Sequence, residues 1–348
     1  EVTSEARVEE GRIQTSLTQT GASGAAERLR KSAAQLTPVY GVLTIVLALA
    51  LLLAGETPLV AVIHAMSTMA TSGITPVNGL IGRPAGVAGE AMILIFFVFA
   101  LSRRTFSRRF DRDWPGRVAV DREVRLAAFA VVVLPTLLFT RHWLGALEVA
   151  TVANFEDALA ALWGGAFTVL SFLTTTGFVS DSWAVARTWS GLETPGLLLL
   201  GLVLMGGGVA TTAGGLKLLR VYALYKHGVR EMGKLIHPNS VGGAGRLGRR
   251  IRREGAYIAW IFFMLFILSL AAVMLALSAT GLGFEQALIL AIAALSTTGP
   301  LAAVAGEAPI AYITLSDPAK LILAAAMIVG RIETLVLIAL LNPAFWRS

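Results

Sequence analysis

Cysteine is absent from the 348-residue sequence, and charged residues make up only 15% of it. The missing thiols exclude a disulfide scaffold, thiolate metal sites and cysteine catalysis. The low charge excludes an ordinary water-soluble domain, in which about 25% of the residues are charged. The four histidines are scattered and lack the spacing of a zinc site, so we expect no histidine metal centre.

Hydrophobic residues, by contrast, make up 55% of the chain, and the mean hydropathy is +0.72. Each of three short apolar segments lies between two longer ones, so the order long, short, long occurs three times. About 13–17 residues of helix are shorter than the membrane core of about 30 Å, so we interpret the short segments as re-entrant half-helices. We thus predict an all-α polytopic membrane protein with long segments at 38–54, 88–102, 124–144, 195–219, 255–280 and 316–341, and short ones at 58–70, 156–172 and 284–296.

Basic residues gather in every second connection between these segments. Residues 103–125 contain eight arginines against four acids, and residues 217–253 contain ten lysines and arginines against one acid. Cytoplasmic connections of membrane proteins carry such an excess of lysine and arginine. We therefore expect the basic connections and both chain ends in the cytoplasm. Topology also accounts for the net charge of +7 without nucleic-acid binding.

The three short segments end alike. Their last ten residues are His64-Ala-Met-Ser-Thr-Met-Ala-Thr-Ser-Gly73, Thr168-Val-Leu-Ser-Phe-Leu-Thr-Thr-Thr-Gly177 and Leu290-Ala-Ile-Ala-Ala-Leu-Ser-Thr-Thr-Gly299. The final glycines are 104 and 122 residues apart, which indicates repeat units of about one hundred residues.

Irregular backbone at membrane depth is tolerated only where it is buried or lines a water-filled cavity. Glycine adopts positive φ and turns nearby carbonyls toward an axis, where rings of carbonyls replace the hydration shell of a monovalent cation. The alternative is that these small residues only allow helices to pack closely. We predict a cation filter made of Thr71, Ser72, Gly73, Thr175, Thr176, Gly177, Thr297, Thr298 and Gly299.

Several motifs resemble one known family. They are Ser171-Phe-Leu-Thr-Thr-Thr-Gly-Phe178, Gly206-Gly-Gly-Val-Ala-Thr-Thr-Ala-Gly-Gly-Leu-Lys217, His237-Pro-Asn239, Gly330-Arg-Ile-Glu333 and Asn342-Pro-Ala-Phe-Trp-Arg347. Over essentially its whole length, the chain resembles the Trk/Ktr/HKT superfamily of potassium transporters, and most of all the bacterial Trk-type potassium-uptake pore subunits. The resemblance implies four helix–pore-helix–helix units around one pore in the bacterial inner membrane.

Only three such units are visible here, and they resemble the second, third and fourth. The chain begins with Glu1 instead of methionine, and we expect a first unit to precede it. The predicted organisation is a cytoplasmic polar segment (1–36) and repeat units at 37–118 with Gly73, 119–245 with Gly177 and the glycine-rich loop, and 246–348 with Gly299.

The segment 195–219 is interrupted by glycines, each of which destabilises a helix by about 1 kcal/mol relative to alanine. By resemblance, this stretch is an intramembrane loop below the filter and Arg331 lies at the pore beside it. The predicted gate comprises Gly206, Gly207, Gly208, Thr211, Thr212, Gly214, Gly215 and Arg331. The alternatives are a static bend and, for Arg331, a structural hydrogen bond to helix carbonyls. We expect Lys217 and Arg220 to be solvated.

The leading functional interpretation is potassium uptake, with K⁺ as the transported ion and no cofactor. The alternatives are a sodium-permeable or cation-coupled symporter of the same superfamily, or a non-conducting membrane subunit. The apolar segments lack a Ser–His or paired-Asp constellation and an obvious buried acid, so we predict neither an enzyme nor tight proton coupling. The partners implied are membrane lipid, a second copy in a homodimer and a cytosolic nucleotide-binding regulatory subunit, without nucleic acid.

Overall fold

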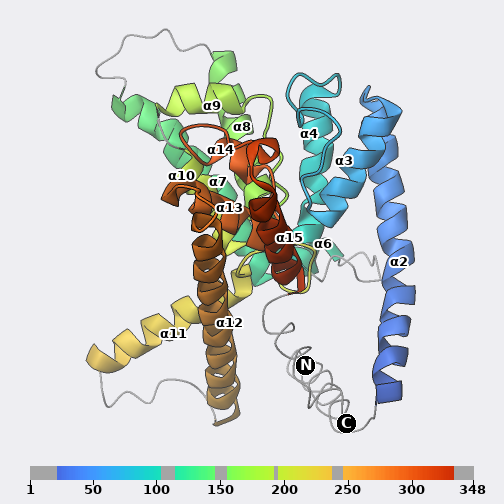
Figure 1. The fold of residues 1–348 in the computed structure, drawn as a ribbon. Helices are drawn as coiled ribbons and strands as arrows, with labels where there is room; N and C mark the ends of the chain where they lie inside the picture. Colours follow the sequence, from blue (N-terminus) through green and yellow to red (C-terminus); the bar gives the residue numbers. More distant parts are fainter. Residues whose placement is uncertain (1–21, 103–113, 146–154, 192–194, 237–245, 333–348) are drawn as a thin grey trace.

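The computed structural model describes residues 22–102, 114–145, 155–191, 195–236 and 246–332 (Figure 1). Helices and connecting loops make up this part of the chain, which contains no strand. The helices are α2 (Ala22–Leu53), α3 (Pro58–Ala70), α4 (Gly86–Phe96), α5 (Val98–Leu101), α6 (Trp114–Ala119), α7 (Arg122–Gly145), α8 (Phe155–Leu173), α9 (Trp183–Ser190), α10 (Gly196–Met205), α11 (Leu218–Ile236), α12 (Arg246–Ser278), α13 (Phe284–Leu295), α14 (Leu301–Val304) and α15 (Asp317–Ile332), with a 3₁₀ turn η2 (Tyr312–Thr314).

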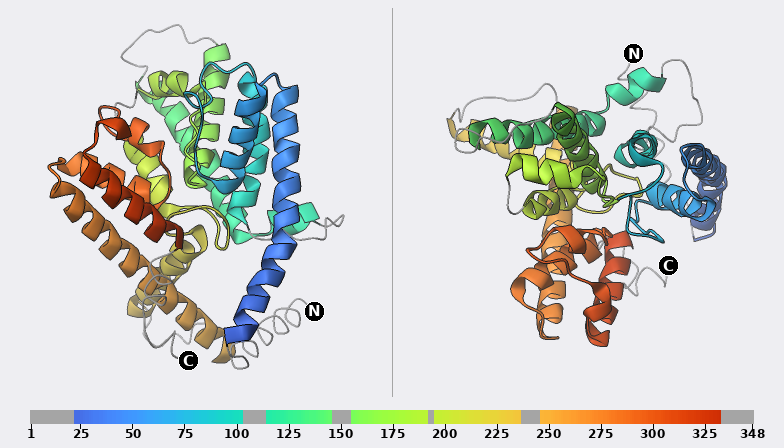
Figure 2. Two further views of the ribbon diagram at one scale, coloured as in Figure 1. Left: turned by 45° about the vertical axis from the view of Figure 1, so that its right-hand side comes forward. Right: turned by 90° about the horizontal axis from the view of Figure 1, so that it is seen from above.

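The helices pack in three consecutive groups, which lie side by side in the view from above (Figure 2). The first contains α2, α3 and α4, the second α7, α8 and α10, and the third α12, α13 and α15. In each group, the middle helix directly precedes three of the predicted filter residues. We call these the Thr-x-Gly segments: 71–73, 175–177 and 297–299. The predicted order of three elements around each of these segments agrees with this packing, although α4 and α10 are shorter than the middle helices α3 and α8.

Among the described residues, four helices are long and apolar enough to cross a membrane by length and composition. Three of them, within α2, α7 and α12, match predicted spans. The fourth is α8, whose 19 residues exceed the half-helix predicted at 156–172, so that expectation of its length was wrong. Burial still separates α8 from the other three, because 56% of its residues are buried, against 17% in the window of α2 and 6% in that of α12.

Two predicted spans are interrupted. The segment 88–102 forms α4 and α5, which are divided at Phe97. The segment 195–219 forms α10, which ends at Met205, and α11, which begins at Leu218, so the break predicted from its glycines is confirmed. The last span is described to Ile332, and its predicted continuation lies outside the described residues. Helix α2 starts at Ala22, inside the segment predicted to be polar and cytoplasmic.

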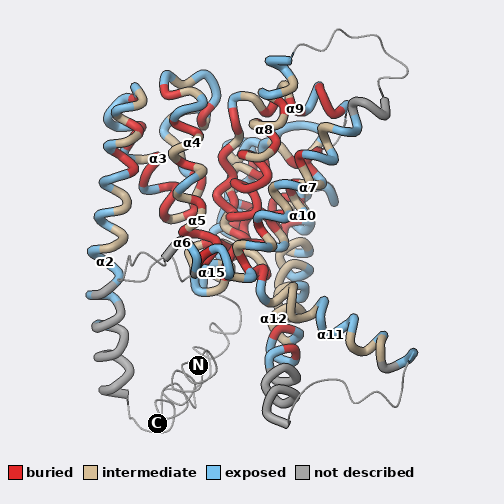
Figure 3. The backbone as a smooth tube through the Cα atoms, turned by 180° about the vertical axis from the view of Figure 1, so that it is seen from behind, coloured by how far each residue is buried: buried red, intermediate tan, exposed pale blue. Residues whose placement is uncertain are grey.

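The buried core surrounds the ends of the middle helices. Burial is concentrated along α8 and α13. Much of the surface of α2 is exposed, whereas the residues around α8 are largely buried (Figure 3). Every residue of α13 from Ile289 to Leu295 is buried. Large apolar side chains such as Val42, Leu49 and Leu268 are exposed on the outer helices, as expected where the surrounding solvent is hydrocarbon.

Candidate functional site: three converging helix ends

The three Thr-x-Gly segments, far apart in the sequence, meet in the structure. A Cβ atom on Gly73 would lie 2.2 Å from the carbonyl oxygen of Thr176, and one on Gly177 would lie 3.0 Å from Cγ2 of Thr298. The Thr298 hydroxyl donates a hydrogen bond of 3.1 Å to the carbonyl of Thr175. The predicted filter residues therefore form one cluster at the buried centre.

All three segments end their helices by the same backbone arrangement, a Schellman motif, in which an amide bonds back to a carbonyl five residues earlier. The next amide toward the N-terminus bonds three residues back in each case. The five-residue bonds run from Ser72 to Ser67 at 3.0 Å, from Thr176 to Ser171 at 2.9 Å and from Thr298 to Ala293 at 2.8 Å. This equivalence shows that the sequence similarity reflects a shared local structure.

Threonine, and not only glycine, adopts the left-handed conformation. Thr71, Thr175 and Thr297 have φ of 50°, 58° and 56°. Gly73 and Gly177 also have positive φ, but Gly299 does not, so the expectation that the glycines turn the chain was incomplete. A β-branched residue in this region is a genuine outlier with a cost of about 1–2 kcal/mol. Such strain gathers at functional sites, and residue type alone did not reveal it.

The hydroxyls of these three threonines have different partners. Thr175 Oγ1 accepts a 2.6 Å hydrogen bond from the amide of Gly214, whereas Thr71 Oγ1 donates to the carbonyl of Ala70 at 2.7 Å. Thr297 Oγ1 is buried and has no hydrogen-bond partner among the described residues. Since buried polar groups are normally paired, this hydroxyl is available to a further ligand. The three threonines thus share one backbone conformation, but their hydroxyl groups have different surroundings.

The glycine-rich loop between α10 and α11 lies directly against the cluster. A Cβ atom added to Gly214 would lie 2.0 Å from the carbonyl oxygen of Ser296. One added to Gly208 would lie 2.1 Å from that of Leu101, and one added to Gly206 would lie 2.3 Å from that of Gly214. Backbone atoms cannot move aside as the end of a flexible side chain can. Close packing thus explains why these three residues are glycines, which is what the alternative of a static bend predicts. The mobility of the loop stays a prediction.

Side chains of the loop bind the groups around it. The Thr211 hydroxyl and the Gly208 amide both donate to the carbonyl of Ala100, at 2.9 and 3.1 Å. The Thr212 hydroxyl donates to the carbonyl of Met69 at 3.1 Å. The loop is therefore hydrogen-bonded to α5 and to α3, as well as to the filter residue Thr175.

Arg331 on α15 connects the loop with the first filter segment. Its Nη1 donates to the carbonyl of Thr212 at 2.6 Å, and its Nη2 donates to that of Ala70 at 3.4 Å. The residue is exposed in the described structure, and its predicted place at a pore stays a prediction. The two predicted gate components are thus in contact, although the contact alone does not distinguish gating from a structural hydrogen bond.

Lys217 differs from its sequence expectation. We expected a solvated charge, but the residue is 6% exposed and its ammonium donates to the carbonyl of Ala213. The neighbouring Arg220 places its guanidinium 3.6 Å from the centroid of the Phe262 ring, a cation–π contact. Both cations hold the end of the glycine-rich loop and the start of α11 against the protein.

Three carboxylates that sequence reasoning missed are buried in the structure. Glu56, Glu90 and Glu123 are 5%, 2% and 5% exposed, so the expectation of no buried acid was wrong. Glu56 forms a 2.6 Å ion pair with Arg83, and Glu123 accepts a 2.7 Å hydrogen bond from the loop amide of Val209. Glu90 lies within an apolar span, a position that marks functional groups in membrane proteins.

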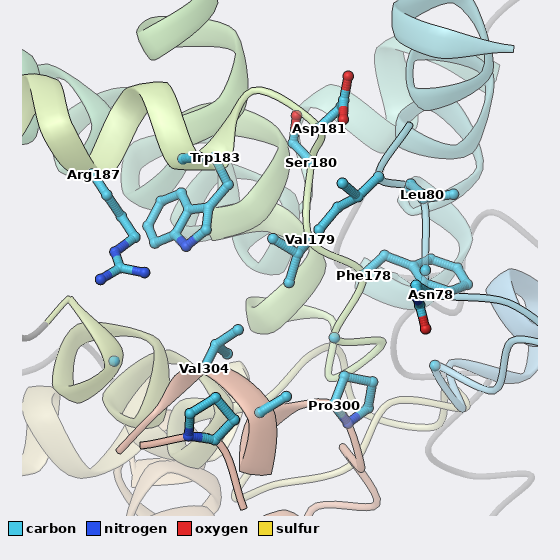
Figure 4. Close-up of a pocket in the computed structure, with 18 of the residues that line it drawn as sticks. Asn78, Leu80, Phe178, Val179, Ser180, Asp181, Trp183, Arg187, Pro300 and Val304 are labelled. Carbon is cyan, nitrogen blue, oxygen red and sulfur yellow. The ribbon is translucent and has the colours of Figure 1, made fainter. Parts of the chain in front are cut away.

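A cavity of about 760 Å³ adjoins the cluster. It reaches Gly73, Gly177 and Pro300, and Trp183 and Arg187 line its wall (Figure 4). The described residues contain no group of three or more acidic, histidine or cysteine side chains able to hold a metal. The cavity therefore leads to the helix ends without offering a multivalent-metal site of that kind.

The fold defines an all-helical protein of the polytopic membrane class. The chain belongs to the TrkH family, described as cation transport protein, whose model matches residues 123–347. It is 32% identical over 331 residues to the Trk system potassium uptake protein TrkH of Salmonella typhimurium, covering 92% of this chain and 64% of the relative. It is 29% identical over 317 residues to TrkI of Halomonas elongata, covering 89% of this chain and 60% of the relative.

A solved structure also matches. The crystal structure of the potassium transporter TrkH from Vibrio parahaemolyticus is similar with a TM-score of 0.75 and 28% sequence identity, over 92% of this chain and 66% of that chain. The present chain spans less than two thirds of the length of these proteins. The comparisons thus establish the family and the fold, and the activity of the whole protein is a proposal.

Proposed function

We propose that the protein carries K⁺ across a membrane through a passage lined by the nine predicted filter residues. One observation carries this proposal: three helix ends with the same Schellman motif and the same left-handed threonine meet at the buried centre. The Salmonella and Halomonas relatives are named potassium uptake proteins, which agrees with the ion proposed here.

The chemistry of the segments supports a monovalent cation. Their nine residues carry no charged side chain, so the ligands available are carbonyl and hydroxyl oxygens. Carbonyl rings replace the hydration shell of K⁺, whereas filters for other cations use rings of carboxylates. The unpartnered hydroxyl of Thr297 adds one more oxygen ligand at the same place.

We further propose that the glycine-rich loop and Arg331 form the gate. The loop amide of Gly214 binds Thr175 in the second filter segment, and Arg331 binds the loop at Thr212. Loop displacement would break both contacts. A guanidinium beside the passage also repels K⁺, because two positive charges at close range repel each other.

The proposed setting is the bacterial inner membrane, with both chain ends and the basic connections in the cytoplasm. The charge distribution supports this orientation. The name "Trk system" of the relatives supports assembly with further components. We therefore propose lipid contact, a homodimer and a cytosolic nucleotide-binding regulatory subunit as partners.

The test expresses the complete gene product that contains these 348 residues in a bacterium without its own potassium uptake systems. We expect growth at low K⁺ and uptake of Rb⁺ that K⁺ inhibits and Na⁺ does not. A Gly177→Ser variant is the negative control, because φ of +83° and contacts of 3.0–3.2 Å oppose a side chain there. Inhibition by Na⁺ would favour the sodium-permeable or coupled alternative, and no uptake would favour a non-conducting subunit.

A further inference from the structure

Glu90 is the most buried carboxylate described, with 2% of its surface exposed. It lies on α4, within an apolar segment, and belongs to none of the predicted filter or gate residues. A buried charge is costly unless hydrogen bonds satisfy it. The partners of Glu90 therefore indicate what the protein gains from keeping a carboxylate here.

Three donors converge on Glu90 from later parts of the chain. Its Oε2 accepts 2.7 Å hydrogen bonds from Nε1 of Trp163 and from the hydroxyl of Ser180. Its Oε1 accepts a 2.7 Å bond from the amide of Asp181. Trp163 lies on α8, which leads into the second filter segment, and Ser180 and Asp181 follow that segment. One carboxylate thus holds the chain both before and after Gly177.

A second bond from the first helix group reaches the same place. The carboxylate of Asp181 accepts a 2.8 Å hydrogen bond from the amide of Gly82, in the connection between α3 and α4. Ser180 and Asp181 border the cavity, at the end of the segment that continues from Phe178 and Val179 (Figure 4). The segment leaving the second filter is therefore fixed from outside its own helix group.

We propose that Glu90 is a positioning residue that sets ion discrimination at the second filter segment. It holds Ser180 and Asp181, and through them the carbonyls of Thr175 and Thr176, at the spacing that suits one dehydrated cation. This inference rests on the proposed function. It adds a residue outside the filter, contributed by the first helix group, that determines selectivity.

The chemistry of the three donors makes a carboxylate necessary. A glutamine of the same shape has one acceptor oxygen and one NH₂ group. If its oxygen faces Trp163 and Ser180, its NH₂ opposes the amide of Asp181. If its oxygen faces Asp181, its NH₂ opposes the indole N–H of Trp163, while the Ser180 hydroxyl turns to accept. Glu90→Gln therefore leaves at least one of these donors without an acceptor.

The experiment measures Rb⁺ uptake and its inhibition by Na⁺ in cells that express the complete gene product. Glu90→Gln is expected to lower the discrimination of Rb⁺ over Na⁺ about tenfold at an equal amount of protein in the membrane, as the loss of a hydrogen bond to a charged group predicts. Glu156→Gln is the matched control, because Glu156 is exposed on α8, and it should leave discrimination unchanged.

A second substitution separates positioning from general stability. Trp163→Phe removes the indole N–H, so in the double variant with Glu90→Gln the side-chain amide oxygen is free to accept from Asp181 while the NH₂ group donates to Ser180. The double variant should recover much of the discrimination that Glu90→Gln loses, whereas two purely structural lesions would add. The inference is overturned if Glu90→Gln discriminates Rb⁺ from Na⁺ as well as the wild type does. It is also overturned if the double variant discriminates no better than Glu90→Gln alone.

Two further outcomes are decisive. If Glu90→Gln fails to reach the membrane, Ser180→Ala replaces it, because that change removes one small hydroxyl donor. Unchanged discrimination in Ser180→Ala then overturns the inference. A wild type that takes up no Rb⁺ overturns the proposed function and this inference with it, whereas a selective wild type with an equally selective Glu90→Gln overturns the inference alone.

Discussion

At the scale of single residues, the left-handed threonines show why glycine is not simply used at every turn of the site. Glycine would remove a cost of about 1–2 kcal/mol at Thr175. It would also remove the hydroxyl that accepts the 2.6 Å hydrogen bond from Gly214. The threonine at position 175 therefore keeps the strained backbone and, with it, the hydrogen bond that joins the filter to the loop. Thr71 and Thr297 share the strain without that link.

Arg331→Ala is predicted to raise Rb⁺ uptake. The substitution removes the bonds to Thr212 and Ala70 and removes a positive charge beside the proposed passage. Because the guanidinium is exposed, we assign the lost contacts only about 1 kcal/mol, which shifts a closed–open equilibrium about fivefold. Initial rates of Rb⁺ uptake, normalised to the amount of protein in the membrane, test this.

Arg331→Lys is the control for this change. Lysine keeps the charge but offers a compact ammonium in place of the planar fork, so one of the two carbonyl bonds is lost. We expect a rate between those of the wild type and Arg331→Ala. An unchanged rate in Arg331→Ala at normal expression would remove Arg331 from the gate and leave it as a structural hydrogen-bond donor.

At the scale of elements, interruptions were easier to predict than lengths. The glycines between Met205 and Leu218 predicted the break between α10 and α11, because each destabilises a helix. The length of α8 was misjudged because apolar character alone does not separate a spanning helix from a buried one of 19 residues. Tertiary burial makes that distinction, and the sequence pattern does not contain it.

The same limit applies to the site. The Thr-x-Gly repeats could be predicted because similar local endings recur in register. The burial of Glu90 and Lys217 could not, since each depends on donors or carbonyls brought together by folding. Glu90 stands inside the predicted apolar segment 88–102 and was still overlooked, and its three partners come from residues that lie 73 to 91 positions away.

Gly214→Ala is predicted to damage the glycine-rich loop. Its Cβ would lie 2.0 Å from the carbonyl oxygen of Ser296, so the backbone of the loop or of the third filter segment must shift. Overpacking of this kind destabilises by about 1–3 kcal/mol. We expect a lower melting temperature of the purified protein and loss of Rb⁺ uptake.

Gly201→Ala on α10 is its matched control. Nothing lies within 4 Å of the added methyl group, and alanine favours a helix by about 1 kcal/mol over glycine. The melting temperature should stay the same or rise, with uptake retained. Equal behaviour of the two variants would show that the loop has room for a side chain, contrary to the packing described.

At the scale of the whole molecule, the two ends differ in character. One end carries α9, α14 and the connection between α3 and α4, while α11 extends from the opposite end (Figure 1). The cavity beside the filter reaches Asn78 and Arg187 at the first end. The segment 217–253, with ten basic residues against one acid, begins at the second. From the positive-inside rule we predict that the basic end faces the cytoplasm and the cavity faces the outside.

Single-cysteine labelling tests this orientation, because these 348 residues contribute no thiol of their own. Asn78→Cys and Ala308→Cys place thiols at exposed positions of the cavity end, and Gly228→Cys places one on the exposed surface of α11 with nothing within 4 Å of its Cβ. A membrane-impermeant maleimide added to intact cells should label the first two only. After the membrane is opened, Gly228→Cys should be labelled to a similar extent. Labelling of Gly228→Cys in intact cells, with protection of Asn78→Cys and Ala308→Cys, would invert the molecule and place the proposed gate, rather than the filter, nearer the outside.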